Sequence, residues 1–252
     1  MSVEVDAKKS SQSGLAETVR VIIHALILAL VVRVFLYQPF NIPSGSMKST
    51  LLVGDYLFVS KFSYGYSRYS FPFGFDLYNG RVFGSEPKRG DVAVFKLPRD
   101  NETDYIKRVI GLPGDRIQMR RGQLYINDNP VPKKRVADFV QIGPYGNKTR
   151  IARYEETLPN GVTYKVLDAE PQGSFDNTSE YVVPDRHYFM MGDNRDNSTD
   201  SRAPWAVGYV PYENFVGRAE IIFFSATQRW SFFKFWQWPT TLRWARFFKL
   251  ID

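Results

Sequence analysis

Two serines flank a single glycine in residues 41–47 (NIPSGSM), directly after a long apolar segment. Pro43 fixes the backbone just upstream, and Gly45 allows a tight turn with room for another backbone to approach. A serine in such a turn attacks a substrate only if a base lies beside it. Of the two histidines in the chain, His24 lies within the apolar segment. If Ser46 is a nucleophile, we therefore expect its base to be a residue other than histidine.

Lys107 is the lysine whose surroundings best suit such a base. It lies in the apolar stretch 105–110 (YIKRVI), and strand alternation would place it on one face with Tyr105 and Val109. Because a lysine ordinarily has a pKa of about 10.4, it accepts a proton near neutral pH only when burial keeps it uncharged. The required fall in pKa is about 2–3 units, or about 3–4 kcal/mol, which desolvation can supply. Lys107 is thus a hypothesis for the base.

The composition indicates an ordered, basic chain without cysteine chemistry. The 252 residues are enough for a membrane segment and one or two modest domains, and the 44% of hydrophobic residues argue against extensive disorder. A net charge of +7 suits nucleic acid or an anionic membrane surface. The apolar segment, together with the lack of a nucleic-acid-binding motif, favours the membrane, so we expect no nucleic-acid partner. Without cysteine there is no disulfide, thiolate nucleophile or cysteine metal site.

The apolar segment has the length of a membrane span. Residues 19–37 approach the roughly 20 residues that a transmembrane helix needs, and we expect the helix to occupy residues 15–38. Its uninterrupted apolar part is only about 12 residues long, a length also typical of a signal peptide. No small-residue cleavage site follows it, however, so the sequence favours a retained anchor.

The basic residues around the span predict its orientation. Lys8, Lys9 and Arg20 precede it, whereas Arg33 alone follows it closely. This bias places the N-terminus in the cytoplasm and the bulk of the chain outside. Residues 1–14, which are polar and Ser-rich at their end, are expected to form a disordered cytoplasmic tail.

Short β-forming runs separated by turn signals predict a mainly β domain after the span, which would carry Ser46 and Lys107. Residues 39–130 form its expected first part and residues 181–226 its second part. Residues 131–180 are polar and loop-rich, with a turn signal at Asn160-Gly161 between two strand-like runs. We expect them to form an inserted β subdomain or flap.

Two aromatic segments leave their role open. Residues 64–83 are rich in tyrosine, phenylalanine and glycine, and could pack on the core or enter the headgroup region of a bilayer. Residues 227–252 form a tail that interleaves aromatic and basic side chains. That composition suits a membrane surface or single-stranded nucleic acid, and the neighbouring anchor favours the membrane. The tail could also pack against the β domain.

Three stretches together resemble the motifs of bacterial type I signal peptidases, also called leader peptidases, which are serine endopeptidases with a Ser–Lys dyad. Residues 43–55 are similar to the nucleophile motif, and residues 105–115 (YIKRVIGLPGD) to the general-base motif. Residues 192–202 (GDNRDNSTDSR) resemble the third motif. The motifs occur in the family's order behind an N-terminal anchor, and the likeness covers about residues 38–225, less well in the inserted region. Three long motifs in order are far more specific than one.

The resemblance implies a role for each polar residue of these motifs. Ser46 would attack the scissile carbonyl, and Lys107 would take its proton, protonate the leaving amine and later activate a water to hydrolyse the acyl-enzyme. The backbone N–H of Ser46 and the hydroxyl of Ser44 would form an oxyanion hole. Ser198 would orient the Lys107 ammonium. Without the resemblance, Ser44 could merely support a turn and Ser198 could cap a loop.

The remaining implied roles are structural support and substrate binding. Asp200 and Arg202 would form a supporting ion pair. Shallow apolar pockets would accept small residues at positions −1 and −3 of the cleavage site, as in A-x-A-like secretory signals. The residues implied to line them are Ile42, Pro43, Met47, Leu51 and Tyr105.

We expect neither a metal nor another cofactor. Asp193 and Asp196 could be considered as ligands, but no histidine or glutamate accompanies them at a ligand spacing. The chemistry expected from the serines and the lysine also requires no metal ion.

These observations predict a membrane-anchored serine endopeptidase that cleaves signal peptides from exported preproteins. We expect a monomer that crosses the bacterial inner membrane once, with a cytoplasmic N-terminus and the catalytic domain on the outer, periplasmic face. Its partners would be preprotein signal peptides and the lipid bilayer. One alternative is a related Ser–Lys peptidase with a narrower task, such as pilin or conjugation-factor maturation. The other is a non-enzymatic β domain that binds lipid or a partner through its tail.

Overall fold

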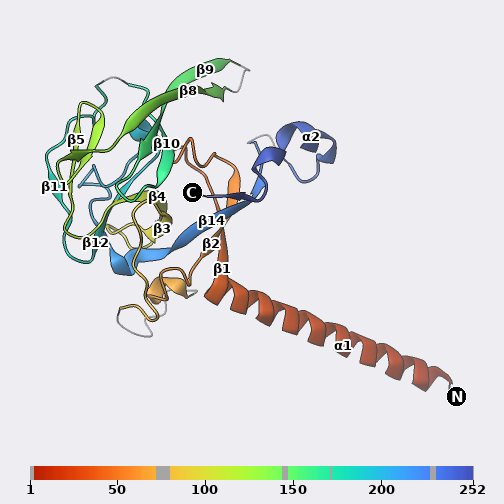
Figure 1. Cartoon of the computed structure of the whole chain (residues 1–252). Coiled ribbons are helices and arrows are strands. Elements are labelled where there is room, and N and C mark those ends of the chain that lie inside the picture. Colours follow the sequence, from red (N-terminus) through yellow and green to blue (C-terminus); the bar gives the residue numbers. More distant parts are fainter. Residues whose placement is uncertain (1–2, 72–79, 144–146, 171, 228–230, 252) are drawn as a thin grey trace.

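A long helix followed by antiparallel sheets makes up the chain (Figure 1). This computed structural model describes the chain except residues 1–2, 72–79, 144–146, 171, 228–230 and 252, and gives no side chains for residues 3–15. Parts of the predicted aromatic loop 64–83 and tail 227–252 therefore lie outside the described residues. The predicted fold class, mainly β behind an N-terminal helix, is confirmed.

The N-terminal helix α1 (Val3–Val31) projects away from the β domain and continues as a π-helical turn, η1 (Val32–Leu36) (Figure 1). Among the described residues, Ala16–Leu36 is the one helical stretch long and apolar enough to cross a membrane, with a mean hydropathy of 2.4. The helix already begins at Val3, which differs from the disorder predicted for residues 1–14. Each residue added to an existing helix gains a backbone hydrogen bond without a new nucleation cost.

The span also ends slightly earlier than predicted, because Tyr37 and Gln38 belong to the first strand. They pair with Ser60 and Val59 of the next strand, so the chain leaves the helix directly into the main sheet. The anchor and the loop that carries the two serines are therefore separated by a single short strand.

Eight strands form the main sheet, in the order β1-β2-β14-β3-β4-β12-β13, with β15 paired to β14. The long strand β14 lies between β2 and β3, so a late part of the chain pairs with two early strands. Their bounds are β1 (Tyr37–Asn41), β2 (Asp55–Ser60), β3 (Val92–Lys96), β4 (Asp104–Gly111), β12 (His187–Met191), β13 (Val210–Pro211), β14 (Phe215–Ser225) and β15 (Lys249–Leu250).

Two smaller antiparallel sheets lie beside the main sheet. One has the order β11-β5-β6-β7, from β5 (Arg116–Arg120), β6 (Gln123–Ile126), β7 (Asn129–Pro130) and β11 (Tyr181–Val182). The other, here called the inserted sheet, has the order β10-β9-β8, from β8 (Lys133–Ile142), β9 (Lys148–Thr157) and β10 (Thr163–Leu167). All strands of the inserted sheet fall within residues 131–180.

Short helical turns complete the described chain. The C-terminal segment contains the helix α2 (Trp238–Thr241), which lies on the same side of the sheets as α1 in Figure 1. The remaining turns are η2 (Arg68–Ser70), η4 (Arg195–Asn197), η5 (Tyr212–Asn214), η6 (Phe235–Gln237) and η7 (Trp244–Arg246).

Buried side chains join these sheets in three clusters. One cluster lies under the loop after β1 and contains Ile42, Met47 and Leu51 together with residues of β2, β3 and β14. Another joins the smaller sheets to β4 and β12, and it includes Tyr164 of β10 and Phe189 of β12. The inserted sheet is thus packed onto the strands that carry the site, and burial of apolar area stabilises that contact.

Candidate active site

The loop after β1 carries Ser46, and Asn194 of the third motif donates two hydrogen bonds to backbone carbonyls of this loop. The Asn194 amide N–H donates to the carbonyl of Ser46 over 2.9 Å, and the Asn194 side-chain amide donates to the carbonyl of Gly45 over 2.9 Å. Asn194 lies 148 positions further along the chain. Because these bonds fix the backbone on either side of the serine, they limit the directions in which its hydroxyl can point.

Lys107 lies on β4 with its amine directed at this serine. Its Nζ is 2.7 Å from the Ser46 Oγ and also donates to the Ile106 carbonyl over 3.1 Å. The Tyr105 ring covers the amine, with 5.2 Å between Nζ and the ring centroid. Lys107 is 3% exposed and Ser46 is 7% exposed. The two residues that the sequence singled out are therefore in contact and largely shielded from water.

Burial controls the protonation of this lysine. It lowers the pKa of Lys107 from 10.5 to about 8, while the Asp200 and Asp193 carboxylates nearby oppose part of the fall. The shift means that protonation of the buried amine is about 3 kcal/mol less favourable than protonation of a lysine in water. A neutral amine 2.7 Å from a hydroxyl can accept its proton. The pair can therefore generate a serine nucleophile without histidine.

Ser44 lies on the same loop as Ser46 and is exposed. The two hydroxyl oxygens are 3.4 Å apart. When Ser46 attacks a carbonyl, the carbonyl oxygen that becomes negatively charged would thus lie within reach of the Ser44 hydroxyl. This position is compatible with the oxyanion role that the resemblance implies for Ser44.

Ser198 lies close to Gly192 and to the nucleophile. A Cβ added to Gly192 would lie 2.2 Å from the Ser198 Oγ and 2.6 Å from the Ser46 carbonyl oxygen, so only a glycine permits this approach. The buried Ser198 hydroxyl makes no regular hydrogen bond among the described residues, yet it lies close enough to the Asp200 carboxylate to help lower the pKa of that group. The hydrogen bonds of the Lys107 amine go to Ser46 and Ile106, and the orienting role of Ser198 stays a prediction.

Asp200 and Arg202 form a buried ion pair beside the dyad. The guanidinium donates to both carboxylate oxygens, over 2.9 and 2.8 Å, and the Gly192 amide N–H donates to the same carboxylate over 3.0 Å. Burial alone would raise the pKa of Asp200, but Arg202, the Gly192 amide and Ser198 together outweigh it and hold the pKa below its usual value. Asp193 is likewise paired, with Arg108. The third motif thus supplies fixed negative charges near the amine.

A groove with a volume of about 480 Å³ runs up to the two catalytic candidates. It lies between the loop after β1 and strand β4. Of the predicted substrate-binding residues, Ile42, Pro43 and Tyr105 line it. The pattern-based prediction missed further lining residues, which come from both walls and the third motif: Phe40, Asn41, Val94, Asp104, Ile106, Asn197 and Thr199.

Met47 and Leu51 do not line this groove, which differs from the prediction. They are 1% and 0% exposed and pack in the cluster beneath the loop. The turn that follows Ser46, in which the Leu51 amide N–H bonds to the Met47 carbonyl, directs both side chains inward. Their contribution is to support the loop from below.

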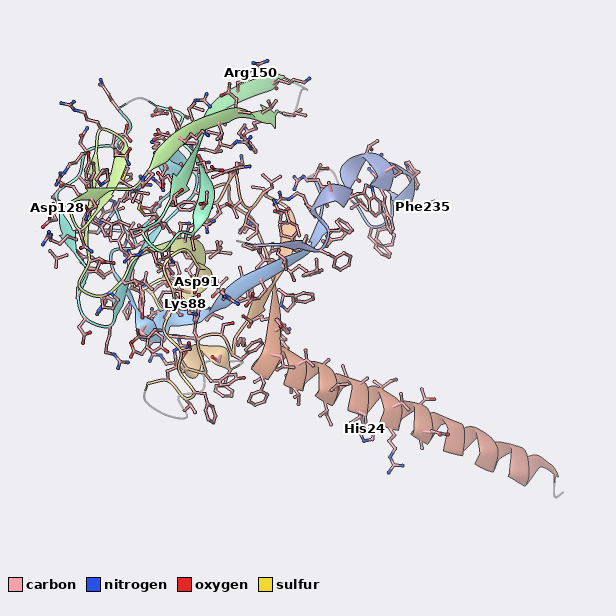
Figure 2. The ribbon with its side chains drawn as sticks, in the orientation of Figure 1. His24, Lys88, Asp91, Asp128, Arg150 and Phe235 are labelled. Atoms are coloured by element: carbon pink, nitrogen blue, oxygen red, sulfur yellow. The ribbon has the colours of Figure 1, made fainter. Side chains whose placement is uncertain are left out.

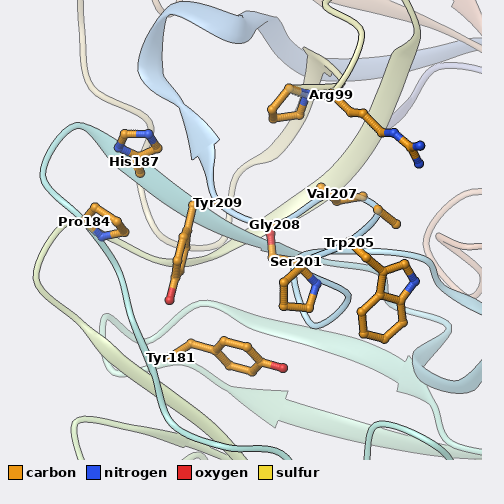
Figure 3. A pocket seen from close by; sticks show the side chains of 12 residues that line it. Arg99, Tyr181, Pro184, His187, Ser201, Trp205, Val207, Gly208 and Tyr209 are labelled. Carbon is orange, nitrogen blue, oxygen red and sulfur yellow. The ribbon is translucent and has the colours of Figure 1, made fainter.

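Neither histidine lies at the groove. His24 is on α1, outside the β domain (Figure 2). His187 lines a second cavity of about 620 Å³, together with Tyr181, Trp205 and Tyr209 (Figure 3). Ser46 and Lys107 are not part of that cavity. The basic side chain that contacts Ser46 at the groove is thus Lys107.

Asp196 takes part in a group of three carboxylates outside the groove. Its oxygens lie within 4.8 Å of those of Asp168 and Asp176. Each already has a protein partner: Lys133 donates to Asp168, and backbone amides in residues 169–173 donate to the other two. These contacts account for the arrangement of the group.

Comparisons with known proteins identify the family of the chain. Residues 15–224 match the family described as signal peptidase, peptidase S26. The chain is 43% identical to signal peptidase I of Rickettsia prowazekii over 240 residues, covering 88% of each chain. It is 44% identical to that of Rickettsia akari over 214 residues, covering 81% of this chain and 77% of the relative.

A solved structure of signal peptidase I from Enterococcus faecalis is also similar, with 25% identity and a TM-score of 0.31, covering 53% of this chain and 97% of that one. The resemblance drawn from the three motifs is confirmed by the family match and by the curated relatives. The chain therefore belongs to the signal peptidase family, peptidase S26, whose members are serine endopeptidases.

Proposed function

We propose that this protein is a membrane-anchored endopeptidase that removes N-terminal signal peptides from exported preproteins through Ser46 and Lys107. The observation that carries the proposal is the 2.7 Å contact between the buried Lys107 amine and the Ser46 hydroxyl at the groove. A lysine held neutral beside a serine is a competent base–nucleophile pair.

The reaction would proceed in two halves. Neutral Lys107 takes the hydroxyl proton as Ser46 Oγ bonds to the scissile carbonyl carbon, and the resulting oxyanion is stabilised by the Ser46 backbone N–H and the Ser44 hydroxyl. When the peptide C–N bond breaks, the Lys107 ammonium gives its proton to the leaving amine. Lys107 then takes a proton from water as the water attacks the acyl-enzyme, and it returns this proton to Ser46. The signal peptide leaves with a new carboxylate.

The groove favours small side chains beside the scissile bond. Ile42, Pro43 and Tyr105 contribute apolar surface on two walls, and Phe40, Val94 and Ile106 narrow it further. A bulky residue at position −1 or −3 would meet these side chains, whereas alanine would fit. We therefore propose substrates with small residues at both positions.

The helix α1 would anchor the enzyme in the bacterial inner membrane as a single span. The bias of Lys8, Lys9 and Arg20 over Arg33 supports a cytoplasmic N-terminus, with the catalytic domain on the periplasmic face as a monomer. The helix α2 of the C-terminal tail lies on the same side of the sheets as α1 (Figure 1). Exposed aromatic side chains of this tail would contact the bilayer surface: Phe232, Phe233, Phe235, Trp236, Trp244 and Phe248.

The proposal is tested with the full chain in detergent and a fluorogenic peptide that carries Ala-x-Ala before the scissile bond. We expect turnover by the wild type and none by Ser46→Ala or Lys107→Ala, with both variants folded. Full cleavage by either variant would exclude this dyad. A panel of unrelated preproteins then separates general signal-peptide processing from a narrower maturation task, because the narrower enzyme would accept one substrate.

A further inference from the structure

Four charged side chains and one tyrosine form a buried cluster next to the candidate active site. The cluster contains two guanidinium groups, two carboxylates and one phenol, each at most 5% exposed: Arg108, Glu156, Tyr164, Asp193 and Arg195. Its two positive and two negative charges balance. Because a charge inside a protein is tolerated only with a partner, each member depends on the others.

Two ion pairs and the tyrosine ring hold this cluster together. Arg108 donates to both oxygens of Asp193, over 3.0 and 2.9 Å. Arg195 donates to both oxygens of Glu156, over 2.9 and 2.5 Å. The Tyr164 ring lies 4.3 Å from the Arg108 Cζ, and its hydroxyl donates to Glu156 over 2.7 Å. The ring therefore connects one ion pair to the other.

The cluster joins every catalytic motif to the inserted sheet. Arg108 follows Lys107 on β4, and Thr50 of the nucleophile loop donates to Asp193 over 2.5 Å. Asp193 and Arg195 belong to the third motif. The two remaining members come from the inserted sheet, namely Glu156 on β9 and Tyr164 on β10.

The inserted sheet also contacts the nucleophile loop directly. Lys48, two residues after the nucleophile, donates from Nζ to the Gln141 side chain of β8 over 2.9 Å. The Ser49 hydroxyl donates to the Lys165 carbonyl of β10 over 3.0 Å. The loop is thus held by hydrogen bonds from one edge strand, β8, and from the other, β10.

We propose that the inserted sheet positions the catalytic dyad, with Glu156 and Tyr164 as positioning residues that never touch the substrate. This inference rests on the proposed function of Ser46 and Lys107. Through the two ion pairs, Glu156 and Tyr164 fix Arg108, the residue next to Lys107. The edge strands β8 and β10 fix the loop that carries Ser46. A misplacement of about 1 Å between reacting groups can reduce the rate about 10²-fold.

The first test removes one charge of the cluster while keeping its shape. In Glu156→Gln, the Arg195 guanidinium stays buried without a counter-ion. We expect kcat to fall at least tenfold with KM within twofold, because no residue of the inserted sheet lines the groove. Changing Arg195→Gln in the same protein removes both charges and should recover at least threefold in kcat. The control Asp138→Asn, which breaks the exposed pair with Arg135 on the same sheet, should leave kcat unchanged.

A second readout does not require activity. Lys107 in the full chain is treated with an amine-acylating reagent, and its modification is followed by mass spectrometry. We expect several-fold faster modification at Lys107 in Glu156→Gln than in the wild type, and no change in Asp138→Asn. If the wild type shows no Ser46-dependent turnover, the proposed function fails, whereas the labelling still decides whether the inserted sheet holds Lys107.

The outcomes separate positioning from general stability. If Glu156→Gln does not fold, Tyr164→Phe takes its place. This change keeps the ring and removes only the hydroxyl, which donates to Glu156 and accepts from Arg195 over 3.1 Å, and kcat should fall about threefold or more. A folded variant with kcat within twofold of wild type and unchanged labelling at Lys107 would overturn the inference. The inference would also be overturned if Glu156→Gln accelerated labelling equally at all lysines and kcat did not recover in the double variant with Arg195→Gln.

Discussion

The neutral fraction of Lys107 should set how activity depends on pH. Burial lowers the pKa of this lysine to about 8. If only the neutral amine accepts the Ser46 proton, about half of the enzyme is competent at pH 8, about a tenth at pH 7 and about a hundredth at pH 6. The acid limb of kcat/KM should therefore rise tenfold per pH unit and level off above pH 8.

The assay is hydrolysis of the Ala-x-Ala peptide by the full chain in detergent from pH 5.5 to 10, with the peptide well below KM. Under this condition the pH profile reports the free enzyme rather than its substrate complex. Lys107→Arg is the matched control, since a guanidinium stays charged over the whole range and should be inactive at every pH.

Two results would refute this reasoning. A kcat/KM that is constant between pH 6 and 8 would mean that no base titrates there. An acid limb centred near pH 10 would mean that the lysine has its ordinary pKa and is solvated, in conflict with an exposed fraction of 3%. Either result would remove Lys107 as a buried neutral base.

Three further predictions follow from the site and the tail. Ser44→Ala should lower kcat about 10²–10³-fold with little effect on KM, as loss of an oxyanion donor does, and an unchanged kcat in the peptide assay would dismiss that role. Lys107→Met should raise the thermal midpoint at pH 7, because burial of the protonated amine destabilises the folded wild type. Between pH 8 and 10.5 the unfolded wild type binds a proton that the folded protein does not, so calorimetry should show the gain shrinking as pH rises through that window. A gain independent of pH would contradict the linkage. Trp236→Phe should reduce quenching of tryptophan fluorescence by brominated lipids in reconstituted full chain. The control Trp205→Phe, at a similarly exposed residue of the second cavity, should not, and equal effects would argue against lipid contact by the tail.

Local patterns were sufficient for the anchor and the type of fold. The apolar segment has a span-like length whatever follows it, so the helix was predictable although its ends were not. Val3 already belongs to the helix, and Tyr37 already belongs to β1. The second boundary depends on a neighbour, since a strand needs a partner and Tyr37 finds one in Ser60. Turn signals likewise predicted many short strands without fixing their order.

The partners within the site could not be read from spacing. Met47 and Leu51 have side chains suited to a substrate pocket, yet the turn of the loop directs them into the core. Ser198 packs against Gly192 near the Ser46 carbonyl, which no spacing predicts, because a hydroxyl's neighbours depend on backbone paths from distant parts of the chain. Asn194, which holds the nucleophile loop, carried no signal beyond its place in the third motif.

The amino-acid sequence by itself determined which groups can react: a serine in a tight turn, no histidine suited to serve it, and a lysine within an apolar strand. Only the tertiary structure decided that Ser46 and Lys107 lie 2.7 Å apart and that Glu156 and Tyr164 of the inserted sheet belong to the same buried network. The physical reason is that residue chemistry and strand period are local properties. Distance, burial and the pKa that follows from burial arise only when strands far apart in the chain pack together.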